Sequence, residues 1–312
     1  MSMLALKNRL GGRFLQEEPL ARYTAARLGG AAEWLYLAKD SLDELCEVVA
    51  QAWAEAIPVR VLGGGANVLV SDHGIRGLVV INDISEILFG DWHDGRTVSA
   101  TSGTNLTTLA HKCASYGLTG FEWAASVPGT IGGAIVNNAG AHGTDMAASI
   151  ADVAVLEPNG PKLYTREELQ YDYRTSMLKS RADKRYLVLL ATLCLPPDNP
   201  EAIKARMNEN SDYRKKTQPP GASLGSIFKN PLGDYAGRLI EAAGLKGFHI
   251  GSAIVSPVHA NFFINEGEAK AADYRALIEH VQHVVHLKTG VHLEPEIEFV
   301  GEWGILGDTQ KP

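Results

Sequence analysis

The sequence has little cysteine and no long hydrophobic run. Its three cysteines, Cys46, Cys113 and Cys194, show no C-x-x-C spacing. This excludes a disulfide scaffold and a cysteine-based zinc ribbon, and it is typical of a reducing compartment. No run of 18 apolar residues occurs, and the opening segment lacks a basic stretch followed by a long apolar one. Because neither a membrane-spanning helix nor a secretory signal is indicated, we expect a cytoplasmic protein.

Positive charge is also scarce. Lysine and arginine number 29 against 36 acidic residues, so the formal net charge is −7. The basic residues form no stripe, and we expect no binding to nucleic acid or to a membrane surface, and no obligate protein partner is evident. No metal site is expected either, because His280, His283 and His286 have no acid or cysteine at ligand spacing and are typical of a polar helix flank.

Glycine, by contrast, is plentiful, with 32 residues in 312, and a hydrophobic content of 45% is enough for a sizeable core. The order of apolar patterns and turn signals predicts alternating helices and strands, which indicates an α+β or α/β fold. Helices are expected at 42–53, after a capping-box pattern that begins at Ser41, from 106 to Gly117 with Asn105 as the cap, and at 200–216, 236–243 and 271–288. Strands are expected at 33–38, 59–62, 68–70, 78–81, 153–156, 186–195, 250–255, 261–264 and 292–300. The first twenty residues are interpreted as a mobile arm.

Two glycine-rich segments are candidates for binding a ligand through the backbone. The first follows the strand at 59–62 and contains Gly63, Gly64, Gly65, Ala66 and Asn67. Its successive N–H groups could form a nest for a pyrophosphate, although a plain tight turn is the commoner explanation. The second spans 120–143 and includes Pro128, Gly129, Thr130, Ile131, Gly132 and Gly133. It suits either a backbone pressed against a flat ligand or a tightly packed core.

Three further positions carry chemical groups. Ser226, Lys229 and Asn230 fall within five residues, and a turn serine with a solvated lysine is the alternative explanation. Arg174 follows two tyrosines and suits either a carboxylate clamp or a surface ion pair. Glu296 lies in an alternating acidic segment whose acids share one, normally solvated, face. Ser226-x-x-Lys229 with Lys288-Thr289-Gly290 also imitates a serine acyl hydrolase, but the second motif falls where a helix should end at a glycine.

Taken in order, these motifs resemble the UDP-N-acetylenolpyruvoylglucosamine reductase family (MurB-type), in its branch with the shorter substrate domain. The resemblance runs from about Thr24 to Glu296. It rests on the order L-G-x-G-x-N-x-L-V, P-G-T-I-G-G-A, Y-R-x-S, G-S-x-F-K-N-P, A-G-L-K-G, H-A-N-F-x-I-N and L-E-x-E. Ala66 stands where the family usually has serine, whose hydroxyl would contact the flavin diphosphate. Asn137 and His142 similarly replace a methionine and a tyrosine. What these departures do to FAD affinity is left open by the sequence.

The resemblance implies an α+β fold with a two-part FAD-binding region of the vanillyl-alcohol-oxidase (PCMH) type and an α/β substrate-binding domain. The implied domains are 1–85, 86–197 and 198–312. The resemblance implies that NADPH reduces noncovalently bound FAD, and that the flavin reduces UDP-N-acetylglucosamine enolpyruvate to UDP-N-acetylmuramate for peptidoglycan synthesis.

The resemblance also implies roles for individual residues. Ser226 would donate the proton, with Lys229 as its hydrogen-bonding neighbour, Arg174 would hold the substrate carboxylate, and Glu296 would polarise or protonate it. The two glycine segments would bind FAD. The substrate contacts would be Tyr173, Gln218, Lys229, Asn230 and His259. A serine acyl hydrolase and a flavin- or nucleotide-sugar-binding protein without turnover are the alternative functions.

Overall fold

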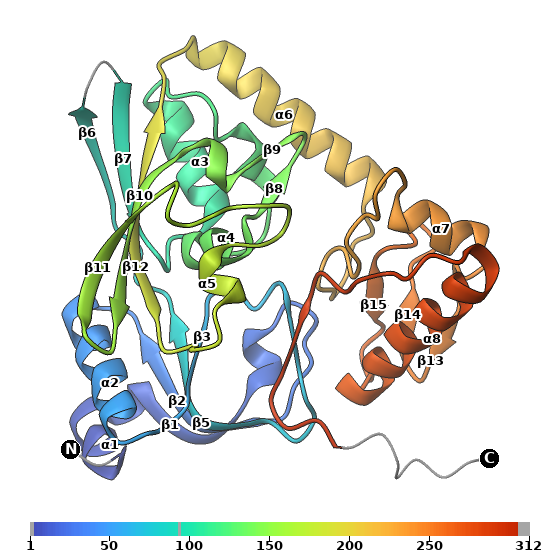
Figure 1. Cartoon of the computed structure of the whole chain (residues 1–312), viewed down its shortest axis with the longest axis horizontal. Coiled ribbons are helices and arrows are strands. Elements are labelled where there is room, and N and C mark those ends of the chain that lie inside the picture. The colour runs from blue at the N-terminus through green and yellow to red at the C-terminus, as the bar shows by residue number, and fades with distance from the viewer. Residues whose placement is uncertain (1–2, 93–94, 305–312) are drawn as a thin grey trace. The chain divides into compact units, whose positions relative to one another are not determined.

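A computed structural model describes residues 3–92 and 95–304 of the chain (Figure 1). Its contacts divide the chain into two compact units. The first comprises the described residues of Met1–Phe14, Tyr36–Gly64 and Val80–Thr217, and the second those of Leu15–Leu35, Gly65–Val79 and Gln218–Pro312. Each unit is therefore assembled from separate stretches of sequence, and the three-part division at 85/86 and 197/198 stays a prediction.

The first unit contains a five-stranded antiparallel sheet in the order β11-β10-β12-β7-β6. The central strand β12 (Leu187–Leu195) pairs with β10 (Ile150–Glu157) and β7 (Gly95–Thr101). The outer strands are β11 (Gly160–Thr165) and β6 (Ile87–Trp92). Alternate residues of β12, from Leu187 to Leu195, carry buried apolar side chains, which is the alternation expected of a sheet covered on one face.

Helices α3 (Leu106–Ser115) and α4 (Ile131–Asn137) lie beside this sheet (Figure 1), and α4 contacts β12 and β7. The predicted N-cap of α3 is confirmed, because Asn105 Oδ1 accepts the N–H of Thr108. Helix α2 (Leu42–Ala54) begins as predicted at Ser41, whose Oγ accepts the N–H of Glu44. The long helix α6 (Pro200–Thr217) ends the unit. The unit also contains β3 (Val59–Leu62), η3 (Glu122–Ser126), β8 (Gly140–Ala141), β9 (Thr144–Asp145), η4 (Met146–Ala148) and α5 (Met177–Ser180).

The second unit packs α8 (Ala271–Thr289) against the three-stranded sheet β13-β14-β15 (Figure 1). The strands are β13 (His249–Ile250), β14 (Ala253–Val255) and β15 (Phe263–Asn265), and α7 (Ala236–Ala242) also contacts α8. A separate pair joins β4 (Val68–Val70) in parallel to β16 (Glu298–Val300). The end of the described chain thereby pairs with residues more than two hundred positions earlier.

The interpretation of the first twenty residues as a mobile arm is wrong, because their described part, from Met3, is folded. Helix α1 (Met3–Leu10), the 3-10 turn η1 (Gly11–Arg13) and strand β1 (Phe14–Pro19) lie there, with Leu6, Leu10 and Phe14 buried. Strand β1 is the edge of a sheet in the order β1-β2-β5-β3, in which β2 is Ala31–Ala38 and β5 is Ile75–Asn82, and η2 (Leu20–Tyr23) follows β1.

Two predicted strands are shorter than expected. The segment 250–255 turns at Gly251, whose φ of +57° interrupts the extended backbone and separates β13 from β14. The segment 292–300 is a strand only from Glu298, and before it Pro295 forms a single bridge with Phe228, as suits a residue without an N–H donor. Lys288 and Thr289 end α8, and Gly290 follows with a φ of +74°, as the helix reading of K-T-G predicts.

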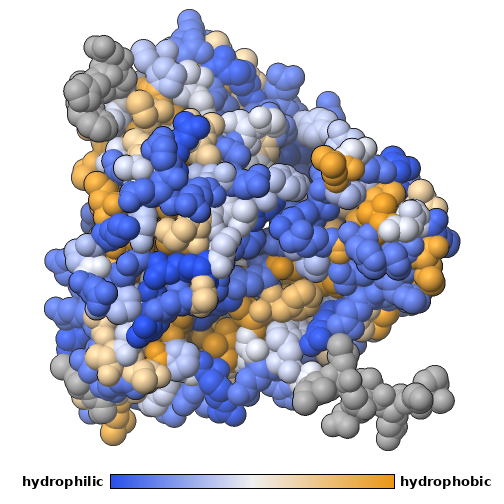
Figure 2. Space-filling model, in the orientation of Figure 1, coloured by the Kyte–Doolittle hydropathy of each residue, from blue (hydrophilic) through white to orange (hydrophobic). Residues whose placement is uncertain are grey.

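Hydrophilic residues cover most of the face shown in Figure 2, with apolar residues in smaller areas between them. Among the helices of the described chain, none is both long and apolar enough to cross a membrane.

Candidate functional site

The two glycine segments meet within the first unit. A Cβ added to Gly64 would lie 3.4 Å from the Cα of Gly129, and one added to Gly63 would lie 2.1 Å from Oγ1 of Thr130. A side chain at Gly63 would therefore collide with Thr130, which explains why only glycine fits there. This contact brings the start of the first segment beside the second, while Gly65, Ala66 and Asn67 belong to the second unit.

Not all backbone donors of the second segment face a ligand. The N–H of Ile131 donates to the carbonyl of Thr104 at 2.9 Å, and that of Gly132 donates to the carbonyl of Ser102 at 2.8 Å. These bonds hold the start of α4 to residues 102–104, so these two amides are not available to FAD, although the resemblance assigns both residues to the FAD site. Gly133 is different, because it is exposed and a Cβ built on it meets no atom within 4 Å.

Arg174 is anchored to the loop that follows α4. Its two terminal nitrogens donate to the carbonyls of Asn138, at 3.4 Å, and of Gly140, at 2.8 Å. Tyr173 stacks near the guanidinium, whose carbon lies 5.2 Å from the ring centre, and is 48% exposed. A guanidinium has five N–H donors in a plane, so it can hold carbonyls of its own chain and also an anionic ligand.

Ser226 and Glu296 lie on neighbouring backbone segments of the second unit. Ser226 forms a bridge with Phe262, and the next residue, Ile227, accepts the N–H of Glu296 at 2.8 Å. The carbonyl of Glu296 accepts Nδ2 of Asn67 at 3.2 Å. The side chain of Asn67 therefore holds the Glu296 segment in place. The sequence analysis did not predict this structural role, because it considered Asn67 only as part of the glycine segment.

Three of the predicted substrate contacts, Lys229, Asn230 and His259, have partners within the second unit. Lys229 Nζ donates to Oε1 of Glu294 at 2.5 Å, so the ammonium pairs with this carboxylate, whereas the sequence analysis expected it beside Ser226. Asn230 Oδ1 accepts the N–H of Ala236 at the start of α7. His259 Nδ1 accepts the N–H of Asn261 at 3.2 Å, and burial lowers the pKa of this imidazole. Gln218 is half-buried at the start of the unit.

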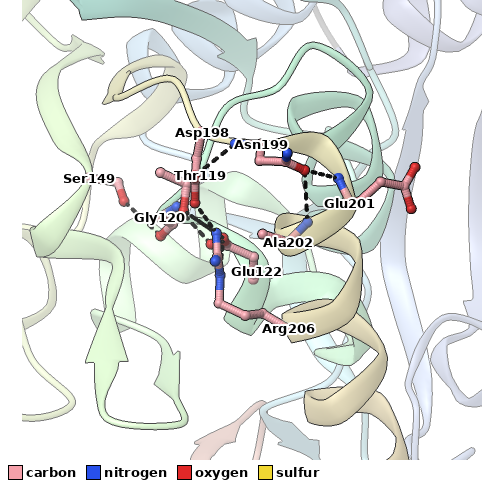
Figure 3. A network of polar contacts seen from close by, with 9 residues as sticks. All are labelled: Thr119, Gly120, Glu122, Ser149, Asp198, Asn199, Glu201, Ala202 and Arg206. Atoms are coloured by element: carbon pink, nitrogen blue, oxygen red, sulfur yellow. Dashed lines mark hydrogen bonds and ion pairs between the residues drawn. The ribbon is translucent and has the colours of Figure 1, made fainter.

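Sequence reasoning missed a polar network that holds α6 against η3 (Figure 3). Arg206 on α6 donates to Glu122 at 2.8 and 3.0 Å, to Thr119 at 2.9 Å and to Asp198 at 2.6 Å. Burial alone would raise the pKa of Glu122, but hydrogen bonds from Thr119, the Gly120 N–H and Arg206 outweigh it and lower the pKa. The spacing of 84 residues between Arg206 and Glu122 leaves no local signal for this pair.

Two family models match the chain. One, described as "FAD binding domain", matches residues 35–163, and the other, described as "UDP-N-acetylenolpyruvoylglucosamine reductase, C-terminal domain", matches residues 216–300. The first covers both glycine segments up to Gly133, and the second covers Ser226, Lys229 and Glu296. The predictions of an α+β fold with a FAD-binding region, and of FAD as cofactor, are confirmed, while the vanillyl-alcohol-oxidase type of that region stays a prediction.

The residues present fit a flavin nucleotide. Gly133 offers an exposed backbone surface on α4 without a side chain. Ser126, three residues before Gly129, has a buried hydroxyl with no partner among the described residues. A buried hydroxyl normally has a hydrogen-bond partner, which a polar ligand can provide. Backbone amides of Gly64 and Gly129 and the hydroxyl of Ser126 are the groups that would hold the cofactor.

Curated relatives match almost the whole chain. The UDP-N-acetylenolpyruvoylglucosamine reductase of Caldanaerobacter subterraneus subsp. tengcongensis is 43% identical over 93% of this chain and 95% of its own. That of Bacillus subtilis is 38% identical over 95% and 97%. The crystal structure of this reductase from Thermus caldophilus superposes with a TM-score of 0.75 at 34% identity, covering 92% of this chain and 97% of that one. The chain therefore belongs to the UDP-N-acetylenolpyruvoylglucosamine reductase family and is a flavin-dependent oxidoreductase.

Proposed function

We propose that this protein reduces UDP-N-acetylglucosamine enolpyruvate to UDP-N-acetylmuramate, with NADPH as the hydride source, in peptidoglycan precursor synthesis. FAD, when bound, would supply the redox chemistry that couples NADPH oxidation to reduction of the enolpyruvyl double bond. The family and the match of 93% of the chain to reductases of this name support the proposal. Since the sugar nucleotide and the reduced coenzyme are cytoplasmic metabolites, we also propose a cytoplasmic location.

The adjacency of Ser226 and Glu296 is the observation on which the chemistry rests. Hydride addition to the vinyl carbon leaves negative charge on the enolpyruvyl carboxylate and requires a proton at the neighbouring carbon. Ser226 is the proposed proton donor. Glu296 is fixed through both its N–H and its carbonyl and can orient or polarise the same part of the substrate.

Arg174 is the proposed holder of the substrate carboxylate. The carbonyls of Asn138 and Gly140 fix the plane of its guanidinium, so little side-chain freedom is lost when an anion binds. Tyr173, Gln218, Lys229, Asn230 and His259 are proposed to contact the substrate. The ion pair with Glu294 fixes the Lys229 ammonium in place, and it remains a suitable group for the diphosphate.

Rapid kinetics of the two half-reactions test the role of Ser226. In Ser226→Ala, flavin reduction by NADPH should proceed at nearly the wild-type rate, because that step uses no proton from Ser226. Reoxidation by the enolpyruvyl substrate should slow at least about 10²–10⁴-fold, the usual contribution of a general acid. Ser223→Ala, in the same loop, is the matched control and should leave both rates unchanged.

Reoxidation of the Ser226→Ala flavin at the wild-type rate would contradict the assignment and make Glu296 the next candidate donor. A colourless wild-type protein would instead contradict the proposed reductase function and favour the serine acyl hydrolase. The place of Lys288–Gly290 at the end of α8 disfavours that alternative, as does the hydrogen bond from Lys288 Nζ to the carbonyl of Ala243 at 2.8 Å.

A further inference from the structure

Arg174 adopts an unusual backbone conformation that something must stabilise. Its φ is +56°, in the left-handed region that residues with a side chain rarely occupy. Asn138, which accepts one of its hydrogen bonds, is also left-handed, with a φ of +45° at the end of α4. The hydrogen bond from the Arg174 guanidinium to the Asn138 carbonyl therefore joins two strained backbone positions. Such positions persist only where surrounding contacts determine them.

Lys179 provides one such contact from inside the first unit. Its ammonium donates to the carbonyl of Arg174 at 3.0 Å and to Oδ1 of Asn137 at 2.5 Å. Asn137 is the last residue of α4, so one ammonium joins the end of that helix to the backbone of Arg174. The Arg174 guanidinium bonds to the two carbonyls that follow, Asn138 and Gly140. Backbone and side chain of Arg174 are thus both fixed to the segment 137–140.

The position of Lys179 is itself fixed by the short helix α5. Ser176 Oγ accepts the N–H of Lys179 at 3.2 Å and donates to the carbonyl of Val136 on α4 at 2.6 Å. Ser176 is buried and Lys179 is half-buried. Ser176 therefore ties the backbone of Lys179 to α4, and the ammonium reaches the carbonyl of Arg174 from this short helix.

We propose that Lys179 and Asn137 form a positioning pair that holds Arg174 in the conformation in which it grips the substrate carboxylate. The proposal rests on the proposed function of Arg174. Asn137 is one of the positions at which this sequence departs from the family pattern, where methionine is usual. Methionine has only a weak acceptor sulfur, so the amide oxygen of Asn137 gives the Lys179 ammonium a partner that the usual residue does not offer.

The test measures both half-reactions in Lys179→Met, with Lys215→Met on the exposed face of α6 as the matched control. We expect flavin occupancy and reduction by NADPH to stay within about twofold of wild type. Reoxidation by the enolpyruvyl substrate should slow about 10- to 100-fold, the range typical of residues that orient a ligand-binding group. Lys179→Arg should restore most of the rate, because its guanidinium can still donate to both oxygens. Lys215→Met should change neither half-reaction.

Asn137→Met serves as a second variant that leaves the lysine in place, and a smaller slowing of the same half-reaction is expected. Arg174→Lys is the benchmark for loss of the grip itself. Wild-type reoxidation in Lys179→Met would overturn the proposal. Equal slowing of both half-reactions, or loss of flavin, would also overturn it by showing a merely structural role. Failure of the proposed function is distinguishable, because then the wild-type flavin itself would not be reoxidised by the substrate.

Discussion

Gly133 is the residue at which flavin binding can be tested with least disturbance of the chain. A valine at Gly132 would press its Cβ to 3.0 Å from that of Ser102, and a valine at Gly63 would collide with Thr130. Loss of flavin in either variant would therefore result either from a clash within the chain or from a clash with the ligand. At Gly133 no atom of the described chain lies within 4 Å of an added Cβ, so any steric effect arises from the ligand.

We expect Gly133→Val to weaken FAD binding by about 10- to 100-fold, the equivalent of overpacking by 1–3 kcal/mol. Stability of the flavin-free protein should not fall, because glycine is the less favourable residue in a helix. Flavin absorbance relative to protein absorbance after dialysis measures the occupancy. Gly12→Val, at another exposed glycine with open space around it, is the control. Full occupancy in Gly133→Val would refute the placement of the cofactor on α4.

Single residues differ in how far the sequence reveals them. Ser226 and Glu296 were predicted because each stands in a short motif, and the structure places their backbones on neighbouring segments. Lys179 was not predicted, because its partners Arg174 and Asn137 become neighbours only when α5 folds against the end of α4. The sequence analysis expects Lys229 beside Ser226, but in the structure the ammonium pairs with Glu294. The 65 residues between Lys229 and Glu294 leave no local signal for this ion pair.

At the scale of elements, the Arg206 network connects α6 to η3, and its energetics depend on pH. The Glu122 side chain is only 10% exposed, and its carboxylate accepts bonds from Thr119, the Gly120 N–H and Arg206. These bonds lower the pKa of Glu122 in the folded state. A carboxyl with a lowered pKa stabilises the fold above its unfolded pKa, about 4.3, and loses this contribution as pH falls through the folded value.

Glu122→Gln should therefore reduce the free energy of unfolding at neutral pH by about 1.5–3 kcal/mol, the range for hydrogen bonds to a charged group. The difference from wild type should be largest near pH 7 and should shrink as the pH is lowered below about 4.3. Urea unfolding at several pH values measures it. Glu167→Gln, at an exposed position, is the control and should show little change at any pH. A pH-independent difference for Glu122→Gln would show that its charge is not what stabilises α6.

The elements that the sequence predicted best are those with local signals. The caps at Ser41 and Asn105 and the glycine after α8 depend on contacts within a few residues, and all three were found. The sequence did not reveal helix α1 and strand β1, because the residues that hold them in place are far away along the chain. Arg13, between them, bonds to both carboxylate oxygens of Glu44, at 2.5 and 3.0 Å. The two-residue strands β8 and β9 are too short for a periodic pattern.

At the scale of the whole molecule, the division into units follows contacts rather than chain order. Leu15–Leu35 and Gly65–Val79 join the C-terminal third, and β16 pairs in parallel with β4. Boundaries drawn from composition, such as the proline-rich stretch at 196–200, cannot reveal segments that return from elsewhere in the sequence. The fold class was nonetheless predictable, because the ordered series of motifs identifies the family independently of how the segments pair.

One measurement tests the central claim most directly: anaerobic reduction of the purified protein with NADPH, followed by mixing with UDP-N-acetylglucosamine enolpyruvate, observed at the flavin absorbance. We predict a yellow protein whose flavin is released by acid precipitation, whose colour is bleached by NADPH, and whose absorbance returns with formation of UDP-N-acetylmuramate. A flavin that NADPH reduces but the enolpyruvyl substrate leaves reduced would contradict the account and favour a binding protein without turnover.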